Sequence, residues 1–187
     1  MEKLVRCKSC GYIMREAKLR DKCPACGVPR EMFEPYTDPM SEPRRRILDF
    51  HLHPSAVHFP TSFAVAVLVF TIATFFFSGP VEQFLICTTQ VMALFLPLLV
   101  LIAFLAGLLD GKTRFRRLDR SHILKSKMLY GSIFFVLAVG LALLVWLGGL
   151  GSVTLICIAV TLAAGGVACS VVLALLGMQI LNSAFPG

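Results

Sequence analysis

Residues 84–109 read FLICTTQVMALFLPLLVLIAFLAGLL and contain no charged side chain. About 20 consecutive apolar residues are enough for a helix to cross the hydrocarbon core of a bilayer. Three more uncharged apolar runs lie at residues 59–77, 128–150 and 153–180. A chain surrounded by lipid must pair its own backbone groups, so we expect each run to form a transmembrane helix. The sequence therefore predicts an all-α membrane four-helix bundle.

Charged residues are few, and the basic ones are confined to two blocks. They make up 16% of the chain, against 57% hydrophobic residues, whereas about a quarter of a soluble domain is charged. Of the 18 Lys and Arg residues, 11 lie at 3–46 and seven at 112–127. Because these blocks flank apolar runs, we expect their partner to be the anionic surface of the lipid bilayer and not nucleic acid.

The basic residues also predict an orientation. The connections after the first and third apolar runs contain no Lys or Arg, so all 18 fall in the N-terminal segment and around the connection after the second run. The positive-inside rule then places both termini in the cytoplasm, in a multi-pass protein of the inner (cytoplasmic) membrane. Residues 1–22 have no apolar h-region, so we expect the N-terminal segment to stay in the reducing cytosol.

Four of the seven cysteines form two matched pairs in this polar segment. Cys7-Lys8-Ser9-Cys10-Gly11 and Cys23-Pro24-Ala25-Cys26-Gly27 repeat one pattern, with 12 residues between the pairs. In each, a tight turn brings two thiolates together, and the following glycine permits a positive φ. Four thiolates predict a tetrahedral sulfur site for zinc or a single iron. So short a segment buries too little apolar surface to fold alone, so metal binding must supply the missing free energy.

The same segment resembles a known family. Residues 7–36, CKSCGYIMREAKLRDKCPACGVPREMFEPY, are similar to a rubredoxin-type module, most of all to the shortened form at the C-terminus of rubrerythrins. The shared marks are CxxCGY, the short spacer, CPxCG and Phe33-Glu34. The resemblance implies one iron that shuttles single electrons between the ferric and ferrous states, held by Cys7, Cys10, Cys23 and Cys26. Zinc ribbons share these knuckles, so zinc is the alternative. No Glu-x-x-His pair occurs, so peroxide reduction at a di-iron centre is not implied.

The histidines gather near the expected cytoplasmic ends of the apolar runs. The motifs HP at 53–54, VHFP at 57–60 and GLLD at 107–110, with His122, resemble a family of small prokaryotic four-helix membrane proteins of unknown function. The resemblance covers residues 53–147, and it implies no reaction.

Imidazoles and a carboxylate at the ends of a bundle are typical ligands of metals and haem. We expect one shared site near the cytoplasmic membrane surface, formed by His53, His58, Asp110 and His122. Within it, His58 and His122 are the expected axial ligands of a b-type haem. A non-haem metal bound by all four side chains is the alternative. A further alternative is that these residues only cap helices and contact lipid headgroups.

These observations predict three parts and a function. Residues 1–36 form a rubredoxin-like four-cysteine metal domain, and residues 53–187 form the four-transmembrane-helix domain. Residues 37–52 form a linker, because prolines and a run of charges discourage regular structure. The predicted function is membrane-bound electron transfer, in which the rubredoxin-type iron passes single electrons between a cytosolic donor and a membrane cofactor or quinone. The alternative is a non-catalytic interaction protein, a zinc ribbon on a membrane anchor.

Overall fold

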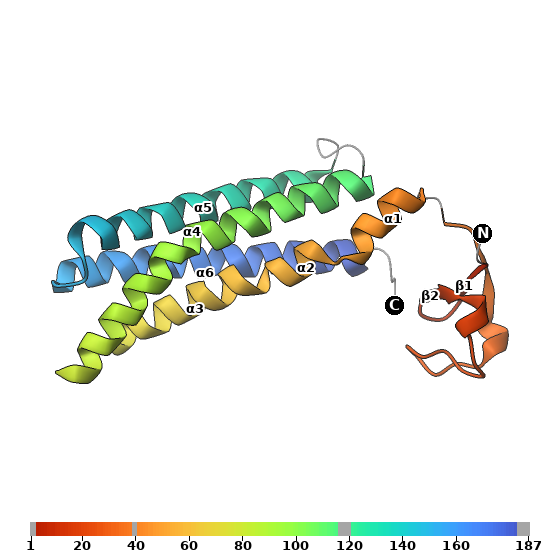
Figure 1. Ribbon diagram of the computed structural model, residues 1–187, viewed down its shortest axis with the longest axis horizontal. Helices are drawn as coiled ribbons and strands as arrows, with labels where there is room; N and C mark the ends of the chain where they lie inside the picture. The colour runs from red at the N-terminus through yellow and green to blue at the C-terminus, as the bar shows by residue number, and fades with distance from the viewer. Residues whose placement is uncertain (1–2, 39–40, 116–120, 183–187) are drawn as a thin grey trace. The chain divides into compact units, whose positions relative to one another are not determined.

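The computed structural model describes residues 3–38, 41–115 and 121–182. By its internal contacts the chain divides into two compact units, one built around the N-terminal strands and the other formed by residues 47–176. Figure 1 shows a small sheet in the first unit and long helices in the second. This confirms the predicted fold class, a helical membrane bundle with a small N-terminal metal-knuckle domain.

The N-terminal unit is a three-stranded antiparallel sheet. Its strands are β1 (Leu4–Cys7), β2 (Ile13–Arg15) and β3 (Phe33–Tyr36), in the spatial order β2-β1-β3. Two short 3-10 helices, η1 (Glu16–Lys18) and η2 (Arg30–Met32), join these elements. The apolar side chains buried here are few, chiefly Val5 and Leu19. So small a core agrees with the expectation that a bound metal stabilises the unit.

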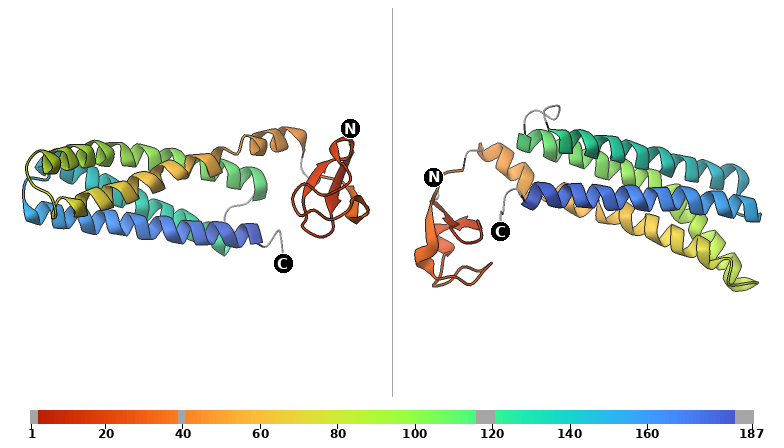
Figure 2. Two further views of the ribbon diagram at one scale, coloured as in Figure 1. Left: turned by 90° about the horizontal axis from the view of Figure 1, so that it is seen from below. Right: turned by 180° about the vertical axis from the view of Figure 1, so that it is seen from behind.

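Four helices in the described part of the chain are long and apolar enough to cross a membrane. Most of each apolar run lies in α3 (His58–Ala73), α4 (Pro80–Phe115), α5 (His122–Gly148) or α6 (Val153–Asn182). The first run extends four residues past the end of α3, and the third extends two residues past the end of α5. Figures 1 and 2 show these helices running alongside one another. Pro97 lies inside α4, which changes direction along its length in Figure 1. A proline removes one backbone hydrogen bond and clashes with the preceding turn, which explains such a bend.

Two of the helices, α4 and α5, extend from their apolar runs into charged residues. α4 continues through Lys112 and Arg114, and α5 begins at His122, six residues before the run at 128–150. Lys and Arg are good helix formers, so a charged residue need not end a helix. The start of α5 is also capped, since the Ser121 hydroxyl accepts a hydrogen bond of 3.4 Å from the backbone N–H of Leu124. The charged residues near the ends of α4 and α5 are therefore helical and do not lie in the connection.

The segment expected to be a linker contains helices. α1 (Glu42–Asp49) lies within residues 37–52, and α2 (Leu52–Ala56) begins at its end. A proline in the first turn of a helix loses no hydrogen bond, so Pro43 is compatible with α1. Arg45 also forms an ion pair with Asp38. The division of the chain at residues 36 and 52 stays a prediction.

The chain is irregular where it enters the bundle. His51, between α1 and α2, has a φ of 49°. α2 ends at Ala56 and α3 begins at His58. Pro60 has no N–H to offer the Ala56 carbonyl, so a continuous helix would lack a bond at this point. The break between α2 and α3 is thus a local consequence of the proline.

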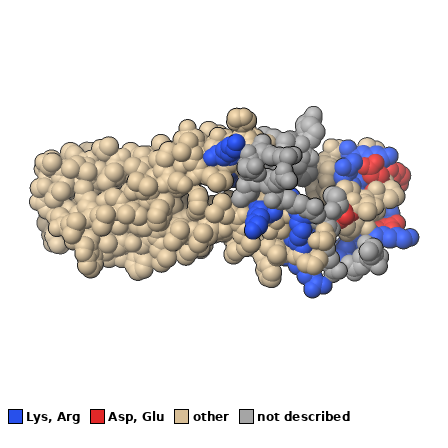
Figure 3. Space-filling view, turned by 90° about the horizontal axis from the view of Figure 1, so that it is seen from above, with Lys and Arg blue, Asp and Glu red and all other residues tan. Residues whose placement is uncertain are grey.

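The outer surface of the helices is apolar. Phe76, Trp146 and Leu147 are each more than 70% exposed, and many other large apolar side chains are exposed along the spans. Figure 3 shows Lys and Arg toward one end of the helices and an uncharged face beyond them. Exposed apolar area of this extent is unfavourable in water and favourable in lipid. The chain therefore has the surface of a membrane protein.

Small residues allow the helices to approach closely. α4 packs against α3 and α5, around a core that includes Ala64, Ala93, Ala138 and Ala159. On α5, a Cβ atom added at Gly131 would lie 2.8 Å from the ring of Phe104 on α4. On the same helix, Gly140 has nothing within 4 Å of the added atom. These two glycines form a matched pair for testing the packing.

We predict that Gly131→Ala destabilises the bundle by about 1–3 kcal/mol, the usual cost of overpacking, because the ring of Phe104 must move. Gly140→Ala should be neutral or stabilising by up to about 1 kcal/mol, because alanine favours a helix. Reversible unfolding of the purified protein in mixed detergent micelles measures both values. Equal stabilities of the two variants would contradict the packing of α4 against α5 at Gly131.

Candidate metal centre

Four sulfur atoms converge in the N-terminal unit. The Sγ atoms of Cys7, Cys10, Cys23 and Cys26 all lie within 4.8 Å of one another. Cys7 and Cys26 are 3.8 Å apart, as are Cys10 and Cys23. A disulfide requires about 2.05 Å, whereas tetrahedral coordination with bonds of about 2.3 Å spaces sulfur atoms about 3.8 Å apart. The separation of these pairs is thus that of a metal–sulfur tetrahedron and not of disulfides.

The two knuckles have the same backbone hydrogen bonds. The N–H of Gly11 donates to the Cys7 carbonyl, and the N–H of Gly27 donates to the Cys23 carbonyl, both at 2.9 Å. The glycines have φ values of 73° and 76°, a conformation that costs a residue with a Cβ more than it costs glycine. Each first cysteine also donates its N–H across the turn, to the carbonyl of Tyr12 or Val28, at 2.8 Å. The repeated pattern in the sequence is therefore a repeated structure.

The sheet sets the position of the first knuckle. Cys7 is the last residue of β1 and pairs with Phe33 of β3. Next to it, Arg6 and Glu34 pair across the same two strands and form an ion pair of 2.6 Å. The N–H of Lys8 then donates to the Met32 carbonyl at 2.8 Å. The sheet therefore anchors the sequence immediately before and inside the turn.

Each knuckle contributes one buried and one accessible sulfur ligand. Cys7 and Cys23 are 1% and 3% exposed, whereas Cys10 is half-buried and Cys26 is exposed. A metal held by these four sulfurs is thus shielded on the side of Cys7 and Cys23. On the side of Cys10 and Cys26 its ligands reach the surface.

The pKa values of Cys10 and Cys23 are shifted in opposite directions. The backbone N–H of Tyr12 lowers the pKa of Cys10, but burial and hydrogen bonds to the other three thiols outweigh it and raise that pKa to about 12. Burial raises the pKa of Cys23, but the backbone N–H groups of Cys26 and Ala25 and the thiols of Cys26 and Cys10 lower it to about 7. A metal cation binds thiolates, so its binding releases protons and weakens as the pH falls.

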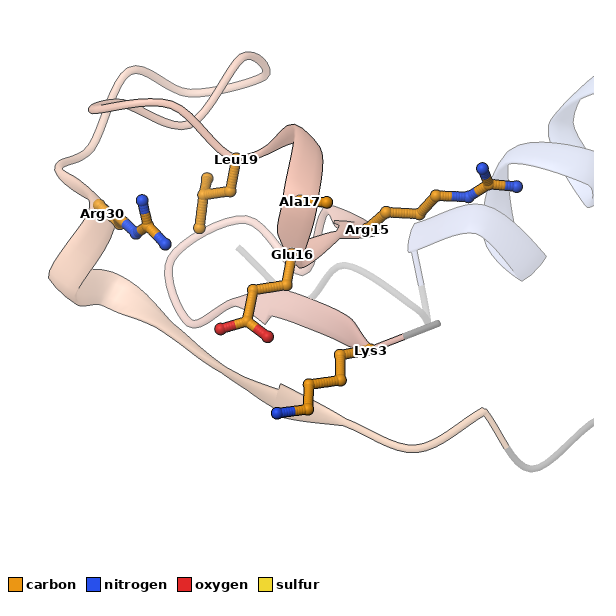
Figure 4. Close-up of a pocket in the computed structure, with 6 residues that line it drawn as sticks. All are labelled: Lys3, Arg15, Glu16, Ala17, Leu19 and Arg30. Carbon is orange, nitrogen blue, oxygen red and sulfur yellow. The ribbon is translucent and has the colours of Figure 1, made fainter. Parts of the chain in front are cut away.

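A separate hollow lies on the N-terminal unit. It has a volume of about 490 Å³ and none of the four cysteines lines it; its lining residues are Lys3, Arg15, Glu16, Ala17, Leu19 and Arg30. Figure 4 shows Glu16, Lys3 and Arg30 around it, while Arg15 extends away from them. Because Arg15 extends away, Lys3 and Arg30 against Glu16 give the hollow a small excess of positive charge.

The histidines predicted to share a site do not form a comparable cluster. Within the described residues, the four cysteines are the group of three or more His, Cys, Asp and Glu side chains close enough to hold an ion. His58 begins α3 and His122 begins α5, and both are exposed. Their pairing as haem ligands stays a prediction.

The other two predicted residues lie in contact with the bundle. His53 is half-buried on α2, and its Nδ1 atom is 3.2 Å from the carbonyl oxygen of Ala103 on α4. Asp110, also on α4, forms an ion pair of 3.3 Å with Arg114. Lys127 of α5 interacts electrostatically with both His53 and Asp110. Sequence reasoning missed Lys127, although it directly precedes an apolar run and is the nearest charge to it.

We predict that removing the metal unfolds the N-terminal unit and leaves the helices intact, because the sulfur site supplies what the small core lacks. Treatment with a strong chelator at mildly acid pH, where protons compete for the thiolates, should make residues 3–38 sensitive to protease. The helical circular dichroism of the bundle should persist. A metal-free unit with unchanged protease resistance would contradict this dependence.

Comparison with known proteins agrees with the geometry. Residues 6–34 match the family model described as "Rubrerythrin, rubredoxin-like domain". No curated protein and no solved structure matches the chain. The resemblance of residues 53–147 to a four-helix membrane family stays a prediction. Residues 6–34 are therefore a rubredoxin-like domain, whose four cysteines form a site that could bind a metal such as iron or zinc.

Proposed function

We propose that the protein is a membrane-bound electron carrier. One iron, held by the four cysteines of the rubredoxin-like domain, exchanges single electrons with a soluble partner in the cytosol and with an acceptor or donor in the membrane. When bound, the iron supplies a one-electron ferric–ferrous couple, and the protein supplies its four ligands and their surroundings.

The observation that carries this proposal is the unequal exposure of the sulfur ligands. Cys26 is exposed and Cys10 is half-buried, while Cys7 and Cys23 lie in the interior. A purely structural metal site needs no accessible ligand, because the metal only stabilises the folded domain. An electron carrier needs a short route from the metal to the surface, and Cys10 and Cys26 provide one.

Backbone N–H groups near the sulfur atoms also support a redox role. The N–H of Tyr12 acts to lower the pKa of Cys10, and those of Ala25 and Cys26 act to lower the pKa of Cys23. Such donors stabilise negative charge on sulfur, and therefore favour the reduced, more negative state of a metal–thiolate site. The family match of residues 6–34 supports iron over zinc.

The helices supply the other half of the proposal. Among the described residues, four helices are long and apolar enough to cross a membrane, and they would attach the metal domain to the bilayer. A membrane cofactor near the predicted histidines, such as a b-type haem or a non-haem metal, or a quinone in the bilayer, would then be the membrane partner. The basic hollow at Lys3 and Arg30 would favour a soluble partner with an acidic surface.

We predict one iron per chain in protein expressed with excess iron. It should give the high-spin ferric electron paramagnetic resonance signal of a four-thiolate site, and its colour should bleach reversibly with dithionite. Cys26→Ser should abolish this signal, whereas Cys169→Ser, at a buried cysteine of α6, should leave it unchanged. Colourless protein with stoichiometric zinc would contradict the proposed redox function. It would favour the alternative, a zinc-ribbon interaction protein on a membrane anchor.

We also predict that both termini lie in the cytoplasm, because all 18 basic residues then lie on the cytoplasmic side. Alkaline phosphatase fused after Gly187 should be inactive, whereas its fusion in the connection after the first span, at Ser78, should be active. The opposite pattern would contradict the orientation and would separate the metal domain from cytosolic electron donors.

A further inference from the structure

The two knuckles that supply the sulfur ligands are attached to the N-terminal unit in different ways. The first knuckle, residues 7–12, is built into the sheet. Cys7 is the last residue of the central strand β1 and pairs with Phe33 of β3. From inside the knuckle, the N–H of Lys8 donates to the Met32 carbonyl at 2.8 Å. β2 begins directly after the knuckle and pairs with β1. Strands therefore hold the first knuckle at both of its ends.

The second knuckle, residues 23–28, is closed on itself. Its backbone hydrogen bonds join residues of the knuckle to one another. Its base is closed by an antiparallel bridge between Lys22 and Pro29 and by the Arg30 N–H, which donates to the Asp21 carbonyl at 3.0 Å. Within the described part of the chain, no backbone hydrogen bond joins residues 23–28 to a strand of the sheet.

The sulfur atoms join the two knuckles. Cys7 lies 3.8 Å from Cys26, and Cys10 lies 3.8 Å from Cys23, so each close pair takes one sulfur from each knuckle. A metal bound to all four sulfurs would therefore cross-link a knuckle fixed by the sheet to one fixed at its base. Cys23 is 3% exposed, although the next three residues of its knuckle are exposed. The burial of Cys23 thus depends on the second knuckle being closed.

We propose that the second knuckle opens to admit and release the metal, while the first knuckle keeps its place on the sheet. Cys23 and Cys26 leave the metal together, because no hydrogen bond to the sheet opposes their departure. Two metal–sulfur bonds break in this opening, water or a chelator takes the vacated positions, and no electron is transferred. The inference rests on the metal site and not on electron transfer, so it applies to iron and zinc alike.

The order in which the cysteines react with iodoacetamide tests this opening. Full-length protein in nanodiscs, with the metal it contains when purified, is alkylated without chelator to a low extent. Mass spectrometry then locates the labels on molecules whose metal domain carries two. Exposure alone would place them on Cys26 and Cys10, since Cys10 is half-buried and Cys23 is 3% exposed.

Opening of the second knuckle instead predicts labels on Cys26 and Cys23. This pair should exceed the pair of Cys26 and Cys10 about fivefold, the ratio that corresponds to one hydrogen bond between the first knuckle and the sheet. A preference for Cys10 over Cys23 would overturn the proposal. So would equal labelling of the two, because the whole unit would then open at once.

Two glycines provide a matched pair of variants. Gly11 and Gly27 end the two knuckles with φ values of 73° and 76°, so alanine adds a similar backbone strain to either. A Cβ atom at Gly27 has nothing within 4 Å, so strain is its only effect. Gly27→Ala should speed release of the metal to a chromogenic chelator about fivefold, because opening relieves the strain. Gly11→Ala should leave the rate unchanged, because the first knuckle stays strained throughout.

Equal acceleration by both variants would contradict the opening of the second knuckle. Metal analysis shows whether each variant is loaded, and if one is not, the labelling of the unaltered protein decides. The same samples separate this inference from the proposed function. Zinc protein that labels at Cys23 before Cys10 contradicts electron transfer alone, and iron protein with the opposite order contradicts the opening alone.

Discussion

Inside the hydrocarbon of a bilayer no water is present to pair with an amide, so each backbone N–H and C=O must find its partner within the chain. This requirement makes every long apolar run a helix and leaves little choice of architecture. It also explains the places where the helices are irregular. At Pro60 the carbonyl of Ala56 loses its partner and the chain breaks into α2 and α3. At Pro97 the helix is kept, and α4 changes direction along its length.

The N-terminal unit obeys a different constraint, because it has too few apolar side chains to hold its own shape. Val5 and Leu19 form most of its buried apolar core. The four cysteine sulfurs lie close together in the same unit. The two halves of the protein therefore differ in what stabilises them. Helix packing holds one half, and the other contains four cysteines that could bind a metal such as iron or zinc. Their stabilities should respond to separate variables, namely detergent for the helices and chelator or acid for the metal domain.

The spans and the cysteine site could be predicted because each depends on local patterns, namely uncharged runs and paired cysteines followed by glycine. The ends of the helices were less predictable. The second apolar run stops at Leu109, but α4 continues to Phe115 through charged residues that favour helices. The third run begins at Met128, but α5 already begins at His122, after the Ser121 cap. α1 formed where prolines and charges predicted a linker. The contact between His53 and Gly107 joins residues 54 positions apart, and a single sequence contains no pattern that predicts such a contact.

The exposure of Cys26 also has a consequence for chemical damage to the site. Oxidants and soft metal ions reach a sulfur site through its most accessible thiolate. In this protein that atom is the Sγ of Cys26, whereas its partner in the same turn, Cys23, is 3% exposed. Chemical damage to the centre should therefore begin at one identifiable atom. A single sulfenic acid at Cys26 would remove one of the four sulfur ligands and, with it, the metal that we expect to stabilise the small unit.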